Sequence, residues 1–173
     1  NLKGMNKHRG FTLTLPMLTK GVAALLYGDT LALLRNQTKV YEKISGQTDF
    51  LTQKWIDFLQ HEFEIKQGYH FRDIKKYTKM MVEDFKEIEK DYDRPVVKVG
   101  IVGEIYMKYA PLGNNHLEDF LIDQSCEVMI PGIMGFMLYA VQNQIEDIGL
   151  YGGNKIRLIL MKILLTYLLK LEK

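Results

Sequence analysis

Helical periodicity dominates the first half of the chain. Apolar residues recur at three- and four-residue spacing in three stretches, 17–37, 48–66 and 71–92. This pattern predicts three amphipathic helices. Pro16 fits the first turn of the first helix, and Thr48 or Asp49 is suited to cap the second. A short alternation of apolar residues and threonine at 11–15 indicates a strand before the first helix.

The pattern changes after Pro95. Two short, almost continuous apolar runs, 96–102 and 126–130, predict strands, and the first has the composition of a strand buried on both faces. The segment 103–113 between them is rich in Gly, Pro, Tyr and Lys and predicts a loop. Asn115, with Glu118 three residues on, predicts a capped helix after that loop. Strand, loop, helix and strand make one parallel βαβ unit with a right-handed crossover.

Two strongly apolar helices are expected at the end of the chain. The first begins near Gly132 and runs to about Asp147, and the second follows Asn154 as its cap and ends near Leu171. Both are apolar on most sides, so we expect neighbours to cover them from more than one direction. Two or three strands cannot form a self-sufficient parallel sheet. The chain therefore pairs with a second copy or forms part of a larger α/β protein.

These patterns define the expected fold class and its division. The class is α/β, with a helix-rich first half followed by a Rossmann-like parallel βαβ segment. Residues 1–94 form the helical segment, and residues 95–173 form the βαβ segment with the two further helices. We expect one compact domain overall.

Composition limits the function further. The formal net charge of +2 gives no electrostatic case for a nucleic-acid partner. The apolar stretch 130–141 is too short to span a bilayer, and Lys162 interrupts 156–171, so no membrane partner is expected. The first ten residues are polar and basic and do not resemble a signal peptide. With a single cysteine, these features predict a cytoplasmic protein.

Candidate ligand-binding residues lie between the two predicted strands, because parallel sheets bind ligands at the carboxyl ends of their strands. A carboxylate, a lysine and two tyrosines next to a helix N-terminus suit a polar, phosphate-bearing ligand. The alternative is that turn formation and helix capping alone shape this segment, and capping accounts for Asn115 without a ligand. The candidate residues are Glu104, Tyr106, Lys108, Tyr109, Asn114 and Asn115. No catalytic residue is assigned.

No metal site is expected from the sequence. Cys126 is the one cysteine, it opens an apolar run, and we interpret it as a buried structural residue. The four histidines, His8, His61, His70 and His116, show no ligand spacing. No phosphate-binding loop ending in Gly-Lys-Ser or Gly-Lys-Thr is present.

Several segments resemble one enzyme family. They are VGIVGEIYMKYAPLGNNHLEDFL (99–121), EVMIPGIMGFMLY (127–139), LLYGD (25–29) and the pair Tyr41-Glu42. Together they resemble 2-hydroxyacyl-CoA dehydratase subunits, in particular the dehydratase-like region of CoA-substrate-specific enzyme activases. The resemblance covers roughly 16–153 and is most specific at GEIY and the two asparagines.

The resemblance implies a function that this chain would serve only in part. In that family an ATP-dependent activator passes an electron to an iron–sulfur dehydratase, which removes water from a 2-hydroxyacyl-CoA. Members contain two or more α/β domains. The cluster cysteines are absent here, so an iron–sulfur cluster would belong to the full protein or a partner. The chain would then supply scaffold and part of an acyl-CoA site. The alternative is a non-catalytic interaction or dimerisation module.

Overall fold

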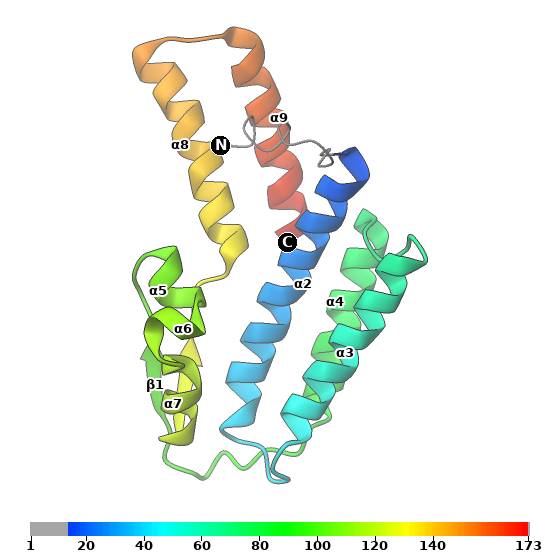
Figure 1. Ribbon diagram of the computed structural model, residues 1–173, viewed down its shortest axis with the longest axis vertical. Coiled ribbons are helices and arrows are strands. Elements are labelled where there is room, and N and C mark those ends of the chain that lie inside the picture. Colours follow the sequence, from blue (N-terminus) through cyan, green and yellow to red (C-terminus); the bar gives the residue numbers. More distant parts are fainter. Residues whose placement is uncertain (1–13, 173) are drawn as a thin grey trace.

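Three long helices form the first half of the molecule. The computed structural model describes residues 14–172. Helices α2 (Leu15–Lys39), α3 (Gln47–Glu64) and α4 (Phe71–Lys86) pack side by side (Figure 1). Thr14 caps α2, and its hydroxyl accepts a hydrogen bond from the Met17 amide at 3.4 Å. All three predicted helices are confirmed, although α4 ends six residues early.

A small parallel sheet follows. Strands β1 (Val97–Gly100) and β2 (Cys126–Met129) pair in parallel, with Val97 opposite Cys126. Helix α7 (Leu117–Asp123) lies between them in sequence and packs on β2. The parallel pairing and this helix were both predicted. The observed architecture is thus helix-rich with a two-stranded parallel sheet among residues 14–172.

The predicted loop between the strands is largely helical. It contains α5 (Ile105–Tyr109) and α6 (Pro111–Asn114), two short helices joined at Ala110. Alanine there has an extended backbone, and the proline that follows occupies the first position of α6. A residue before proline avoids the α region, which explains why one helix stops and another begins.

Two helices form a hairpin at the end of the chain. Helices α8 (Ile133–Tyr151) and α9 (Lys155–Glu172) lie against each other and extend away from the sheet (Figure 1). As predicted, Asn154 caps α9, because its side-chain oxygen accepts hydrogen bonds from the Ile156 and Arg157 amides at 2.8 and 3.3 Å.

The main hydrophobic core joins the first helices to the hairpin. Met81, Phe85 and Tyr27 are buried at its centre, and Met134 of α8 and Leu168 of α9 belong to the same cluster. A second, smaller core lies between the sheet and α7 and contains Ile101, Ile122 and Val128. Helices α2, α3 and α4 and the hairpin therefore share one core.

Helix α2 passes through the middle of this arrangement. Among residues 14–172 it is the one helix long and apolar enough, by length and composition, to cross a membrane. Its Ala23, Tyr27 and Leu31 are buried against other helices.

Several local expectations were wrong. Strand 96–102 is shorter than predicted and is not buried on both faces, since Val97 and Val102 are 65% and 83% exposed. Among the described residues β1 packs mainly against β2, whereas helices α7 and α2 pack on β2, so much of the surface of β1 has no cover. The strand expected at 11–15 lies mostly outside the described residues, and its last residue, Leu15, opens α2.

The end helices also differ from expectation. Within α8 only Met134 is buried, although the helix is apolar nearly all round. On α9 the side chains of Ile156, Ile159 and Ile163 are 69%, 58% and 61% exposed. Each helix is covered along part of its circumference only, because α8 and α9 have each other and α2 and α4 as neighbours.

The start of α3 is capped by a residue that sequence spacing did not identify. Glu42 is buried and lies before the helix, where its two carboxylate oxygens accept hydrogen bonds from the Gly46 and Thr48 amides, each at 2.8 Å. Thr48 and Asp49 lie inside α3. Asp49 instead pairs with Arg35 at 2.9 Å and with Lys39.

Candidate functional site

The carboxyl ends of the two strands meet at one edge of the sheet. Strand β1 leads into α5, and β2 leads through Ile130, Pro131 and Gly132 into α8. Parallel strands place both exits on the same side, so α5 and the start of α8 converge there. The Tyr109 hydroxyl on α5 donates a hydrogen bond to the carbonyl of Pro131, which ties the two exits together.

Asp29 fixes the start of α8 from a distant part of the chain. It lies on α2, and its Oδ1 and Oδ2 accept hydrogen bonds from the Ile133 and Met134 amides at 2.9 and 2.8 Å. These amides are among the first of the helix, which have no carbonyl partner within it. The carboxylate also complements the positive end of the helix dipole. Asp29 therefore acts as a long-range cap of α8.

Gly132 is required by this close approach. A Cβ built on Gly132 would lie 2.5 Å from Oδ2 of Asp29, closer than real contacts allow. A larger residue would displace the Asp29 side chain from its place beside the start of α8. The glycine thus lets the carboxylate reach the amides of the next two residues.

Lys108 is a positively charged side chain at this edge. Its Nζ lies 5.1 Å from the centre of the Tyr109 ring, within the range of a cation–π contact. Among residues 14–172 no carboxylate forms a salt bridge with Lys108. Burial raises the pKa of the neighbouring Tyr109 phenol, and the negative charge of Asp29 raises it further. The neutral phenol is the form that donates the hydrogen bond to the Pro131 carbonyl.

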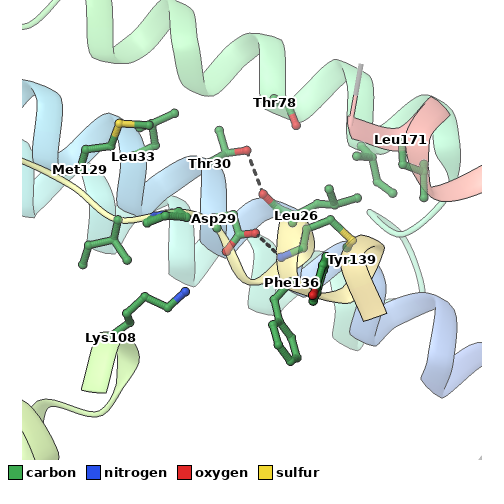
Figure 2. A pocket seen from close by; sticks show the side chains of 16 residues that line it. Leu26, Asp29, Thr30, Leu33, Thr78, Lys108, Met129, Phe136, Tyr139 and Leu171 are labelled. Carbon is green, nitrogen blue, oxygen red and sulfur yellow. Dashed lines mark hydrogen bonds between the residues drawn. The ribbon is translucent and has the colours of Figure 1, made fainter. Parts of the chain in front are cut away.

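A pocket of about 430 Å³ opens between α2, α4, α5 and the start of α8. We call it the carboxyl-edge pocket. Figure 2 shows Lys108 extending toward Asp29 from one side and Thr78 of α4 lying on the other. Its walls are mostly apolar. The lining residues are Leu26, Asp29, Thr30, Leu33, Ile74, Thr78, Lys108, Met129, Ile130, Pro131, Gly132, Met134, Gly135, Phe136, Tyr139 and Leu171.

Lys108 also borders a second pocket, of about 480 Å³, on the side of α7. The charges there are mostly compensated. Arg35 pairs with Asp49 at 2.9 Å, Asp119 at 3.2 Å and Glu118 at 3.8 Å. These pairs join α2, α3 and α7, so they hold the small sheet unit against the helical half. Lys108 is therefore the cation with most freedom to bind a ligand at this edge.

The structure distributes five of the six predicted site residues among neighbouring hollows. Lys108 lines the carboxyl-edge pocket, and with Tyr109 and Asn114 it lines the second pocket. Glu104, at the N-cap position of α5, lines a third hollow with Tyr106 and Lys108. Tyr106 covers Gly113, where an added Cβ would lie 2.4 Å from its ring. Asn115 lines none of these three hollows.

The capping role predicted for Asn115 belongs to Asn114. The Oδ1 of Asn114 accepts a hydrogen bond from the Leu117 amide at 3.3 Å, and its Nδ2 donates to the Met107 carbonyl at 2.9 Å. Asn115 has a left-handed backbone, with φ of 54°, and ends α6. Glu118 does not complete a capping box, because it accepts a hydrogen bond from Asn36 at 2.7 Å.

Sequence reasoning missed four polar residues of the carboxyl-edge pocket, Asp29, Thr30, Thr78 and Tyr139. Asp29 had a detectable signal, since it is a carboxylate in an otherwise apolar helical stretch, 22–34. Such a residue needs a hydrogen-bond partner when it faces the interior. Thr78 and Tyr139 had no detectable signal in the sequence, because their contribution to the pocket depends on how α4 and α8 meet.

Cys126 is half-buried at the start of β2, where its Sγ lies 3.8 Å from the Gln124 carbonyl. In the part of the chain from 14 to 172, no group of three or more His, Cys, Asp or Glu side chains is arranged to hold a metal ion. The residues that are described do not fit an iron–sulfur cluster, which needs several thiolates.

Comparisons with known proteins leave the site to be interpreted from its own geometry. The chain matches no protein-family model, and no curated protein or solved structure matches it.

Proposed function

We propose that this chain is a domain of a 2-hydroxyacyl-CoA dehydratase-like or CoA-substrate-specific enzyme activase protein, and that its carboxyl edge forms part of an acyl-CoA site. The observation that carries the proposal is Lys108. Its ammonium group lies without a carboxylate partner, among residues 14–172, at the carboxyl end of a parallel strand pair. The sequence resemblance supplies the family, and the position of the lysine supplies the site.

Lys108 is the group suited to bind an anionic part of the ligand. A lysine ammonium is a compact charge with three donors and binds phosphate oxygens well. The N-terminus of α8 lies nearby and would otherwise favour an anion. Asp29 already occupies it with a carboxylate, so a phosphate there would meet like charge. The anion therefore binds on the Lys108 side of the edge.

The domain binds and orients its ligand but does not perform electron transfer. Its single cysteine cannot hold an iron–sulfur cluster, which needs several thiolate ligands. A cluster would be supplied by the full protein or by a partner. On this proposal the chain holds one part of an acyl-CoA near a reacting centre located elsewhere.

The test is binding of CoA to the full chain by isothermal titration calorimetry. We expect CoA to bind and Lys108→Ala to weaken its affinity about tenfold, which corresponds to about 1.4 kcal/mol. Lys162→Ala, which removes an exposed lysine from α9, is the matched control and should bind as the wild type does. Absence of CoA binding to the wild-type chain would refute the proposal.

A second candidate function rests on the hairpin. On α9 six exposed apolar side chains share one side of the helix, and contiguous exposed apolar area commonly marks an interface. These residues are Ile156, Ile159, Leu160, Ile163, Leu164 and Tyr167. They favour an interaction or dimerisation module. Sedimentation velocity across a hundredfold range of concentration would detect self-association, and Ile163→Gln should weaken it.

A further inference from the structure

Strand β1 has an open edge on the side away from β2. Figure 1 shows β1 at the outer margin of the molecule, with β2 between it and α2. The backbone groups of successive residues in a strand point to opposite sides. The Ile101 amide donates to the Met129 carbonyl of β2 at 2.9 Å, so the N–H and C=O groups of Lys98 and Gly100 point away from β2. Among residues 14–172 no other element forms hydrogen bonds with these outward groups.

Strand β1 also lacks the features that normally protect such an edge. Monomeric proteins guard an exposed edge with a bulge, a proline, a free charged side chain or a covering segment. The pairing of β1 with β2 runs without a bulge from Val97 to Gly100. Lys98 is the charged residue of β1, and its ammonium group pairs with Glu127 of β2 at 3.2 Å, so it is turned toward its own sheet. The edge is therefore suited to accept a further strand.

The order of residues in β1 suits a second copy of the same strand. In antiparallel pairing about a twofold axis at Gly100, this glycine lies opposite Gly100 of the second copy, and Val99 lies opposite Ile101. Apolar side chains then meet apolar side chains. An axis at Lys98 would place two ammonium groups directly opposite each other, and an axis at Val99 would place them diagonally, which is less favourable in both cases. Charge therefore selects the axis at Gly100.

We propose that two copies of this chain associate through the open edge of β1, antiparallel about Gly100, and form a four-stranded sheet in the order β2–β1–β1–β2. A two-stranded sheet is marginal by itself, whereas four strands are common. The interface is separate from the hairpin and from Lys108, so this inference goes beyond both proposed functions. Antiparallel pairing directs the carboxyl ends of the two β1 strands in opposite directions. The two carboxyl-edge pockets consequently stay apart and open to ligand.

Gly100 allows the open edge to be blocked without disturbing β2. Gly100→Pro removes the outward N–H, and proline is tolerated on an edge strand where its nitrogen faces solvent. The amides of Val99 and Ile101, which face β2, are unchanged. Gly100→Ala is the matched control, because it keeps the N–H and its added Cβ would have no atom within 4 Å. Circular dichroism and urea midpoints would verify that both variants fold.

The experiment is sedimentation velocity of the full chain across a hundredfold range of concentration. We expect the wild type to shift from monomer to dimer. By symmetry, Gly100→Pro removes two hydrogen bonds from each dimer, and each contributes a factor of about two to ten. The dimer dissociation constant should therefore rise at least about tenfold in Gly100→Pro. In Gly100→Ala and in the hairpin variant Ile163→Gln it should stay within about threefold of the wild type.

Hydrogen exchange of the wild type supplies a measurement that needs no variant. The Gly100 amide should be protected at high concentration and should exchange rapidly at low concentration. A wild type that stays monomeric throughout, or a dimer in which this amide exchanges rapidly, would refute the proposal. A dimer that survives Gly100→Pro but is lost in Ile163→Gln would locate the association in the hairpin and would also refute it. CoA binding is measured separately, so none of these results bears on the proposed acyl-CoA site.

Discussion

Helices α2, α3 and α4 differ sharply from the α8–α9 hairpin, although both regions are rich in apolar residues. In the first region Met81, Phe85 and Tyr27 are almost completely buried, and the Tyr27 hydroxyl donates to the Gly68 carbonyl at 2.7 Å. In the hairpin, Leu150 and Tyr151 at the tip are 77% and 84% exposed. Each helix among α2, α3 and α4 packs against neighbouring helices on two sides, whereas each helix of the hairpin packs against neighbours mainly on one side. Burial therefore follows from the number of neighbours and not from apolar content.

The aromatic residues of the first region add directed contacts to this burial. The ring centre of Tyr27 lies 6.3 Å from the ring centres of both Phe63 and Tyr77. The rings of Trp55 and Phe58 pack edge to face, with 5.4 Å between their centres. Such pairs contribute about 0.5–1.5 kcal/mol each beyond the area that they bury. Within the hairpin no aromatic pair is found among the residues that the structure describes. We expect the stability of the chain to be concentrated in α2, α3 and α4.

The largest expected effect comes from a cavity in the first region. Met81→Ala removes a side chain that is 0% exposed, and it should lower the free energy of unfolding by about 2–5 kcal/mol. Leu160→Ala, at a hairpin position that is 62% exposed, should change it by less than about 0.5 kcal/mol. Urea denaturation of both variants measures the difference. Equal losses would contradict the contrast between the two regions.

An intermediate effect is expected where the two regions meet. Asp29→Ala leaves the Ile133 and Met134 amides without their acceptor, which should cost about 1–3 kcal/mol. Asp147→Ala removes an exposed carboxylate elsewhere on α8 and should change stability by less than about 0.5 kcal/mol. Hydrogen exchange would show where the loss falls. If the hairpin amides exchange no faster in Asp29→Ala, this carboxylate does not anchor α8.

The smallest effect concerns pH. Burial alone would raise the pKa of Asp49, but hydrogen bonds and charges from Lys39 and Arg35 outweigh it and hold this pKa below its ordinary value. The pKa of Asp49 is lower in the folded chain than in the unfolded chain, where it is about 3.9. The ionised carboxylate therefore stabilises the fold at pH values above the unfolded-state pKa. This stabilisation is lost as the pH falls through the folded-state pKa. Because the side chain is 43% exposed, we expect less than about 1 kcal/mol.

Asp49→Asn provides the measurement. The difference in unfolding free energy between the wild type and this variant should be constant from pH 7 to about pH 5 and should shrink below about pH 4. Glu89→Gln is the matched control, because it removes a carboxylate that pairs with Lys43 at the exposed surface. A difference that grows with acidification would show that the assigned pKa direction is wrong.

Local features of the fold were predictable from sequence, and long-range ones were not. The α7 helix, the Asn154 cap and the parallel pairing follow from residues within a few positions of each other or from chain direction. The exposure of β1 and of the hairpin could not be predicted, because it depends on which elements lie beside them. The pattern of apolar residues indicates which side of a segment can be buried. It does not indicate whether another helix or strand packs against that side.

The candidate site shows the same division. The sequence predicted that Lys108 and Tyr109 lie at this edge, because they follow a strand that ends there. It assigned the cap of α7 to Asn115, one residue too late, since the left-handed turn at Asn115 and His116 was not visible in the spacing. Asp29 was missed as a site residue because its partners lie 104 and 105 positions away.

That separation has a consequence for synthesis in the cell. A ribosome adds about 5–20 residues per second, so Asp29 emerges roughly 5–20 seconds before the amides of Ile133 and Met134 exist. During this interval α2 lacks the segment that completes its contact with α8. The nascent chain must hold that surface open to solvent or to a chaperone, and the hairpin can dock only when its own first turn has been translated.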